Sequence, residues 1–89
     1  MSAPYDVRSV EHLGGYRLRV GFADGTVRLV DLDGKLSGPV GPIFEPLREV
    51  TFFALATVDA EIGTVVWPNG ADLAPDALHD GAFDAVPAW

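Results

Sequence analysis

The two histidines of this chain, His12 and His79, are its best-suited side chains for proton transfer near neutral pH. Neither lies in a recognisable nucleophile motif with a serine, and the chain contains no cysteine that could act as a thiolate nucleophile. We therefore predict no catalytic residue, and we interpret both histidines as surface or packing residues.

Carboxylates and one histidine recur near the C-terminus at a spacing that suits one face of a helix. In such a helix Asp72 and Asp76 line up with either His79 or Asp80, and oxygen and nitrogen ligands of this kind bind divalent ions weakly. Acids at the start of a helix also complement its positive N-terminal dipole, which explains them without a metal. The glycine-rich residues 34–39 match neither a P-loop nor a dinucleotide fingerprint. The sequence therefore predicts no metal site and no cofactor.

Three arginines, Arg17, Arg19 and Arg28, alternate along two predicted strands and are expected on one face of a sheet. Guanidinium groups on a rigid sheet can bind carboxylates or phosphates. Three interpretations remain open: a solvated face, pairing with the acidic C-terminal half within one chain or between two copies, and contact with an anion or RNA.

The charge of the chain is distributed unevenly. Its net charge is −7, and residues 51–89 contain six acids and no base. The six are Asp59, Glu61, Asp72, Asp76, Asp80 and Asp84. This balance argues against DNA binding by the isolated domain, because phosphate binding needs excess Lys and Arg. It favours a small basic protein as partner, unless the acids serve only solubility.

The first third of the chain predicts a three-stranded antiparallel meander. Residues 16–22 alternate between apolar and polar, and they lie between two turn signals, Gly14-Gly15 and Asp24-Gly25. If Asp24-Gly25 is a two-residue loop, Phe22 lies opposite Val27. The core face then contains Leu18, Val20, Phe22, Val27 and Leu29.

The first hairpin has a conflict in its expected register. Pairing through Gly14-Gly15 places Glu11 opposite Leu18 on the core side. A bulge or a longer turn would remove the conflict.

The second half of the chain predicts a loop, a short helix, a second hairpin and a final short helix. The loop covers residues 34–42 and the first helix residues 43–49. The two strands of the hairpin cover residues 52–58 and 63–67, and the last helix covers residues 73–79. Pro75 suits the first turn of the last helix, and Gly81 suits its C-terminal cap. The fold class is therefore α+β, a small antiparallel sheet of about five strands with two short helices, in the order βββαββα. The residues predicted to be buried are Leu18, Val20, Phe22, Val27, Leu29, Phe44, Leu47, Phe53, Val66, Trp67 and Leu73.

The length of 89 residues leaves room for one hydrophobic core. We assign residues 1–81 to a single domain and residues 82–89 to a C-terminal tail, in which Trp89 is a candidate anchor for a partner. Met1 to Asp6 lack the basic and apolar segments of a signal peptide, and no run approaches the roughly 20 apolar residues of a membrane span. The expected location is the cytoplasm, with no membrane association.

The densest motif lies at residues 64–73, Thr-Val-Val-Trp-Pro-Asn-Gly-Ala-Asp-Leu, where a strand breaks at Pro68 into an Asn-Gly turn. With Pro75 and Leu78 it resembles the small bacterial family called domain of unknown function 2442. Supporting segments are Phe22-Ala23-Asp24-Gly25, Val30-Asp31-Leu32, Phe44-Glu45-Pro46-Leu47 and Phe53. The resemblance covers most of residues 7–78, and His79 replaces the family's usual aromatic residue.

The resemblance implies a compact α+β fold, no established catalytic residues, and neighbouring genes arranged like toxin–antitoxin pairs. The function we expect is a non-catalytic, acidic protein-binding module, the antitoxin-like member of a two-gene pair. The alternatives are a structural or regulatory homodimerisation module and, third, a metal-dependent or hydrolytic enzyme. The candidate partner-binding residues are Arg17, Arg19, Arg28, Trp67, Asn69, Asp72, Asp76, Asp80, Asp84 and Trp89.

Overall fold

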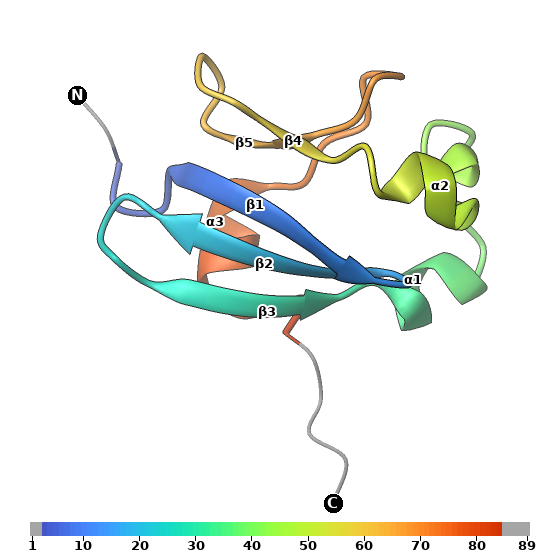
Figure 1. The fold of residues 1–89 in the computed structure, drawn as a ribbon, viewed down its shortest axis with the longest axis horizontal. Helices are drawn as coiled ribbons and strands as arrows, with labels where there is room; N and C mark the ends of the chain where they lie inside the picture. Colours follow the sequence, from blue (N-terminus) through green and yellow to red (C-terminus); the bar gives the residue numbers. More distant parts are fainter. Residues whose placement is uncertain (1–2, 85–89) are drawn as a thin grey trace, which may run out of the picture.

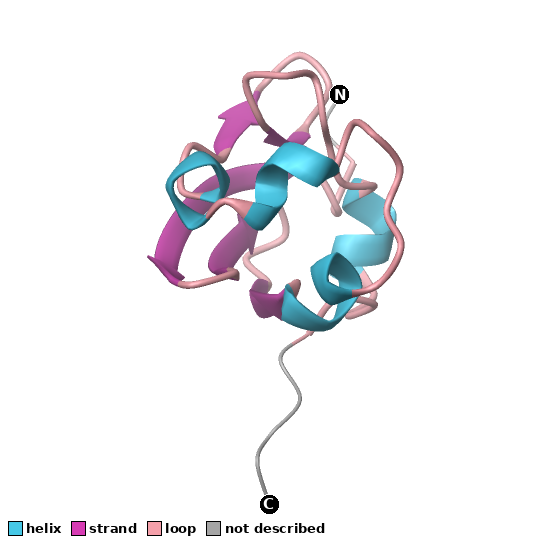
Figure 2. Cartoon of the chain, turned by 90° about the vertical axis from the view of Figure 1, so that its right-hand side faces the viewer, coloured by secondary structure: helices cyan, strands magenta, loops and turns pink. Residues whose placement is uncertain are grey.

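Five strands and four short helical segments form the fold that the computed structural model describes for residues 3–84 (Figure 1). In chain order they are β1 Val7–Gly14, β2 Arg17–Phe22, β3 Val27–Asp31, α1 Asp33–Ser37, the 3-10 helix η1 Glu45–Arg48, α2 Val50–Phe53, β4 Thr57–Asp59, β5 Thr64–Val66 and α3 Pro75–His79. The predicted α+β class and the antiparallel pairing are confirmed. Figure 2 shows how short the helices are and how much loop joins them. No helix within residues 3–84 has the length and apolar character needed to cross a bilayer.

The strands form two sheets, whereas we expected one. Strands β1, β2 and β3 form a sheet in that order, and β4 pairs with β5 in a second, two-stranded sheet. The β4–β5 hairpin lies beside β1 (Figure 1), where the amide of Val7 donates a 2.9 Å hydrogen bond to the carbonyl of Gly63. This contact attaches the turn of the hairpin to the start of β1, but it does not continue the ladder.

The β2–β3 hairpin has a different register from the predicted one. The amide of Phe22 bonds to the carbonyl of Thr26, so the loop has three residues, and its third residue, Gly25, has a φ of +88°. A loop one residue longer turns every residue of β3 to the opposite face. The prediction that Val27 and Leu29 are buried is therefore wrong: their exposed fractions are 58% and 52%.

One face of the three-stranded sheet packs on the core, and we call the opposite one the outer sheet face. The buried residues Leu18, Val20 and Val30 lie on the core side. From the strand registers, the outer sheet face consists of Ser9, Glu11, Arg17, Arg19, Gly21, Val27, Leu29 and Asp31.

The β1–β2 hairpin contains the irregularity that its sequence required. Gly14 and Gly15 both have positive φ angles, of 105° and 53°, as a tight hairpin turn demands. A register shift follows His12, so Glu11 lies opposite Arg19 rather than Leu18. The bulge thus moves the Glu11 carboxylate to the solvent side.

The glycine-rich connector contains a helix that we did not expect. We predicted a loop over residues 34–42, but α1 occupies the first part of that range. Its single turn begins where the carboxylate of Asp31 accepts a 2.9 Å hydrogen bond from the amide of Asp33, and it buries Leu36. Gly34 is tolerated because one turn anchored by a buried leucine depends little on helix propensity.

The apolar segment after this connector is more helical than predicted. Instead of one helix over residues 43–49, η1 and α2 follow one another, with Pro46 in the first turn of η1. The strand expected over residues 52–58 shrinks to β4, because α2 extends to Phe53 and directs that ring into the core. A short apolar run does not by itself distinguish a helix from a buried strand.

The hydrophobic core joins both sheets and α3. Of the residues predicted to be buried, Phe44 and Val66 are only half-buried. Those confirmed as buried are Leu18, Val20, Phe22, Leu47, Phe53, Trp67 and Leu73. The last helix, α3, matches its prediction in two details, with Pro75 in its first turn and Gly81 at a φ of +88° after its end.

Candidate interaction surface

Two of the three candidate arginines lie on the outer sheet face. Arg17 Nε lies 3.2 Å from the Asp31 carboxylate, and Arg19 Nη1 lies 2.9 Å from the Glu11 carboxylate. Each arginine therefore pairs across the sheet with an acid on a neighbouring strand. Both side chains remain mostly exposed.

Arg28 does not share this face, which corrects the predicted grouping of three arginines. The register places it opposite Val20, on the core side of β3. Its Nε donates a 3.0 Å hydrogen bond to the carbonyl of His79, and its Nη1 lies 3.0 Å from the Asp84 carboxylate. Arg28 therefore pairs with the acidic C-terminal part of its own chain, as one of the three interpretations allowed.

The first residues of the predicted tail lie against β3. The amide of Asp31 donates a 2.9 Å hydrogen bond to the carbonyl of Phe83, and Val30 and Asp84 form an isolated antiparallel bridge. The Phe83 ring is partly buried against the core, and Lys35 Nζ lies 5.5 Å from its centre. Trp89, the tail residue that the sequence offers as a candidate anchor for a partner, lies outside the described residues.

Three candidate acids, Asp72, Asp76 and Asp80, form what we call the acidic surface. All three are exposed, and none has an ion pair within residues 3–84. Asp76 lies in α3 and Asp80 is the C-cap one turn later, where its amide donates a 2.9 Å hydrogen bond to the carbonyl of Asp76. Asp72 precedes the helix and bridges to Val66. Their charges are therefore uncompensated, whereas Asp84 is paired with Arg28.

His79 connects α3 to the β2–β3 turn. Its Nε2 lies 2.7 Å from the carboxylate of Asp24, and its ring packs edge-on against Phe22 at 5.0 Å. The amide of Thr26 donates a hydrogen bond to the same carboxylate. This bond first, and then the contact with His79, lower the pKa of Asp24 from 3.8 to about 2.

His12 lies near the end of β1, before the β1–β2 turn. Its Nε2 is 2.9 Å from the carbonyl of Gly15, and its ring makes an edge contact with Phe53 at 5.9 Å. Both histidines thus have packing contacts, as expected. Within residues 3–84 no group of three or more histidines and acids is placed to hold a metal ion, the set around Asp72 and His79 included.

Two of the three candidates in the densest motif, Trp67 and Asn69, make structural hydrogen bonds to other parts of the chain. Trp67 is 3% exposed, and its indole Nε1 donates a 2.9 Å hydrogen bond to the carbonyl of Phe53. Asn69 Nδ2 donates a 2.7 Å bond to the carbonyl of Ile43, and its Oδ1 accepts one from the amide of Ala71. Their polar atoms are therefore occupied within the chain, and the motif fixes the turn that precedes α3.

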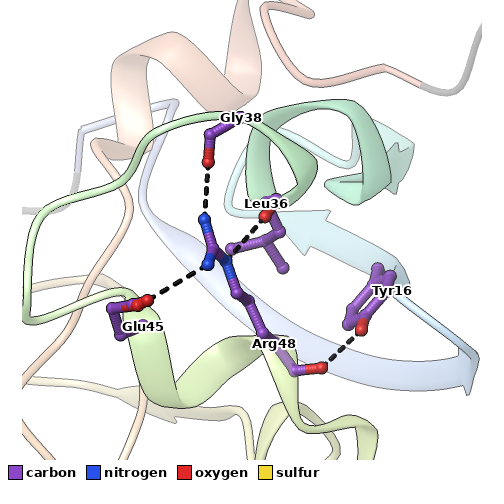
Figure 3. Close-up of polar contacts among 5 residues, drawn as sticks. All are labelled: Tyr16, Leu36, Gly38, Glu45 and Arg48. Atoms are coloured by element: carbon purple, nitrogen blue, oxygen red, sulfur yellow. Dashed lines mark hydrogen bonds and ion pairs between the residues drawn. The ribbon is translucent and has the colours of Figure 1, made fainter.

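Arg48 makes polar contacts with four residues, and we did not single it out from the sequence. Its Nε and Nη2 donate hydrogen bonds to the carbonyls of Leu36 and Gly38, at 2.9 and 2.7 Å, and Nη1 lies 3.1 Å from Glu45 (Figure 3). Its own carbonyl accepts a hydrogen bond from the Tyr16 hydroxyl. The signal that could have found it is an arginine close in sequence to a glycine-rich helix end, where carbonyls lack partners.

A shallow hollow of about 320 Å³ lies beside this arginine. Its lining residues are Tyr16, Asp33, Leu36, Ser37 and Arg48. Since the Arg48 guanidinium already bonds to two carbonyls and a carboxylate, it has no free fork with which to hold an anion in this hollow. The hollow therefore offers no built ligand site.

One comparison with known proteins gives a match. The model of a family described as a protein of unknown function, DUF2442, matches residues 7–84. No curated protein and no solved structure matches the chain. The match extends past Leu78, where the motif ends, and includes Asp84 on the edge of β3.

Proposed function

Because the chain belongs to the DUF2442 family of proteins of unknown function, as its motif indicated, we propose a function from its own surface: a non-catalytic module that binds a small basic protein. The observation that carries this proposal is the acidic surface. Asp72, Asp76 and Asp80 are exposed on one short stretch of chain, and none of them has an ion pair among the residues that the structure describes.

The electrostatics of the chain support this assignment. Residues 51–89 contain no basic residue, so the part of the chain that carries the acidic surface contributes only negative side-chain charge. Arg28 reaches this part from β3, but its ion pair is with Asp84. Charges of one sign around a docking site steer an oppositely charged partner and raise its association rate. The effect falls with salt, because the Debye length is only about 10 Å at 0.1 M ionic strength.

The partner we propose is the product of an adjacent gene, which makes this chain the antitoxin-like member of a two-gene pair. A protein of net charge −7 is suited to covering a basic surface that would otherwise bind nucleic acid. Masking of that kind needs a stable fold and a charged face but no catalytic group.

The test measures association of the chain with the protein encoded beside it. The variant D72N/D76N/D80N removes the acidic surface. We expect a slower association rate with a flatter salt dependence, and a dissociation rate that changes much less. Stopped-flow or surface plasmon resonance experiments at several salt concentrations measure both rates.

The matched control is D33N/E49Q/E61Q, whose three carboxylates are exposed and lie outside the acidic surface. Both variants lose three negative charges, so both change the net charge from −7 to −4. If the control slows association as much as D72N/D76N/D80N does, the effect is one of net charge and the assigned surface is wrong. Absence of binding at micromolar concentration in low salt rejects the proposed function.

A further inference from the structure

The outer sheet face is uncovered within residues 3–84. Val27 and Leu29 lie side by side along β3 at its surface, with exposed fractions of 58% and 52%. Figure 1 shows the three-stranded sheet in front of α3, which packs on the core side. Two aliphatic side chains in the open are unusual on a face whose other members are polar or glycine.

The middle of this face carries no large side chain. Gly21 lies opposite Ser9 on one side and opposite Val27 on the other. A Cβ atom on Gly21 would come within 2.5 Å of the Ser9 hydroxyl, which occupies the space above the glycine. The serine thus fills the gap that the glycine leaves, and no bulky side chain stands between Val27 and the β1 strand.

The charges on the face are balanced, in contrast to the rest of the chain. Arg17 and Arg19 contribute two positive charges, and Glu11 and Asp31 contribute two negative charges, so the face sums to zero. The chain as a whole carries −7, and all of that excess therefore lies elsewhere. Two copies that meet at this face bring no net charge into the contact.

We propose that the outer sheet face is a self-association surface, on which a second copy of the chain packs face to face. A two-fold arrangement brings the same patch of both copies together, so Val27 and Leu29 of one copy pack on their equivalents. The two residues lie on the edge strand β3, next to both ion pairs, Arg17 with Asp31 and Arg19 with Glu11, so each copy presents charges of both signs beside the apolar pair. The face does not include the acidic surface, so the inference is independent of the proposed function.

The face is only three strands wide, so the association is weak. Interfaces this small belong to the transient class. Sedimentation velocity on the full chain alone, from about 10 μM to about 1 mM, covers the range in which such a dimer forms.

The key variant is L29K, which places a charge in the apolar pair of β3. It also lowers the net negative charge from −7 to −6, which by itself favours association. We expect the dimer to weaken at least about tenfold, because a lysine would be buried without a partner. The matched control is I62K, on a residue 54% exposed in the β4–β5 turn, and it should leave the dimer unchanged or slightly stronger. Equal weakening by the two variants, or none by L29K, overturns the proposal.

Salt separates self-association from partner binding. Added salt screens the repulsion between two chains of charge −7, whereas the balanced face itself gains or loses little from screening. We expect self-association to strengthen from about 20 mM to about 500 mM NaCl, the opposite of the dependence expected for a basic partner. A dimer that weakens with salt contradicts the argument from charge.

Chemical shifts on dilution locate the surface directly. In a two-dimensional amide spectrum, Gly21, Val27 and Leu29 should shift with concentration, and Asp76 and Asp80 should not. The full-length variant W89A tests the candidate anchor of the C-terminal tail as an alternative contact, and it should associate like the parent chain. Shifts confined to α3, or loss of association in W89A, would assign the contact to another surface and overturn the proposal.

Discussion

Nε2 of His79 lies 2.7 Å from the carboxylate of Asp24, and this contact joins the end of α3 to the β2–β3 turn. The same turn sets the register of β3. The contact therefore connects the end of α3 to the three-residue loop whose length determines which residues of β3 face the core.

The pH dependence of stability between pH 2 and about pH 4 should contain a contribution from Asp24. The folded pKa of Asp24 is lowered from 3.8 to about 2, so the folded state binds this proton less tightly than the unfolded state does. The stabilisation is complete above about pH 4 and is lost as the pH falls through 2. The D24N variant should show a shallower change in Tm over this range, followed by circular dichroism. A D24N curve parallel to that of the parent would mean that the turn contacts do not persist in solution.

Substitutions in β3 test its register. Val30 is 1% exposed and Leu29 is 52% exposed, so V30A should cost about 2 kcal/mol and L29A less than about 0.5 kcal/mol. The predicted two-residue loop would have required the reverse order. Urea unfolding of both variants measures the two losses of stability. A larger loss of stability in L29A than in V30A would support the register predicted from a two-residue loop.

The R48K variant should destabilise the chain by about 1–3 kcal/mol. Lysine keeps the charge, but it cannot donate to Leu36, Gly38 and Glu45 at once as the guanidinium does. The control R17K affects an exposed arginine with one ion pair and should cost no more than about 1 kcal/mol. Denaturant midpoints and hydrogen exchange in α1 measure both effects. Equal losses would show that charge alone explains the role of Arg48.

Trp67 should behave as a core residue in spectroscopy and in stability. In a W89F background, its fluorescence should be blue-shifted in the folded chain and should move to the red on unfolding. W67F should cost about 1–3 kcal/mol beyond any loss of packing, because the buried carbonyl of Phe53 loses its donor. A red-shifted native spectrum would place the indole in water and exclude the described packing.

The central motif and the last helix could be predicted because local chemistry determines them. Pro68 and the Asn-Gly turn end β5, and Pro75 and Gly81 bound α3 whatever the rest of the chain does. Burial of Trp67 follows from its size and from its place at the end of a β-branched strand. These features required no knowledge of distant contacts.

The face of β3 could not be predicted because it depends on a single residue of loop length. Asp24-Gly25 fits a two-residue loop as well as the observed three-residue loop ending in Gly25. The alternation of Val27, Arg28, Leu29 and Val30 supports either face. The choice follows from Arg28, whose partners His79 and Asp84 lie more than 50 residues away in sequence.

The helix α1 and the members of the candidate site were harder to predict because they also depend on contacts between residues that are distant in sequence. The contacts of Arg48 with Leu36 and Gly38 stabilise a helix that local propensity disfavours. The acidic surface was visible in the sequence, but the pairing of Asp84 with Arg28 and the burial of Trp67 were needed to separate its members from structural residues.

The connector between α1 and η1 has a kinetic consequence. Its start is fixed by the bond from Arg48 to Gly38, and its end by the bond from Asn69 to Ile43, so both anchors come from later parts of the chain. The loop closed by the second anchor spans 26 residues, and its entropy must be lost before the anchor forms. The connector should therefore become ordered after the folding transition state. Substitution of its half-buried Val40 should accelerate unfolding and leave the folding rate nearly unchanged, with a φ-value near zero.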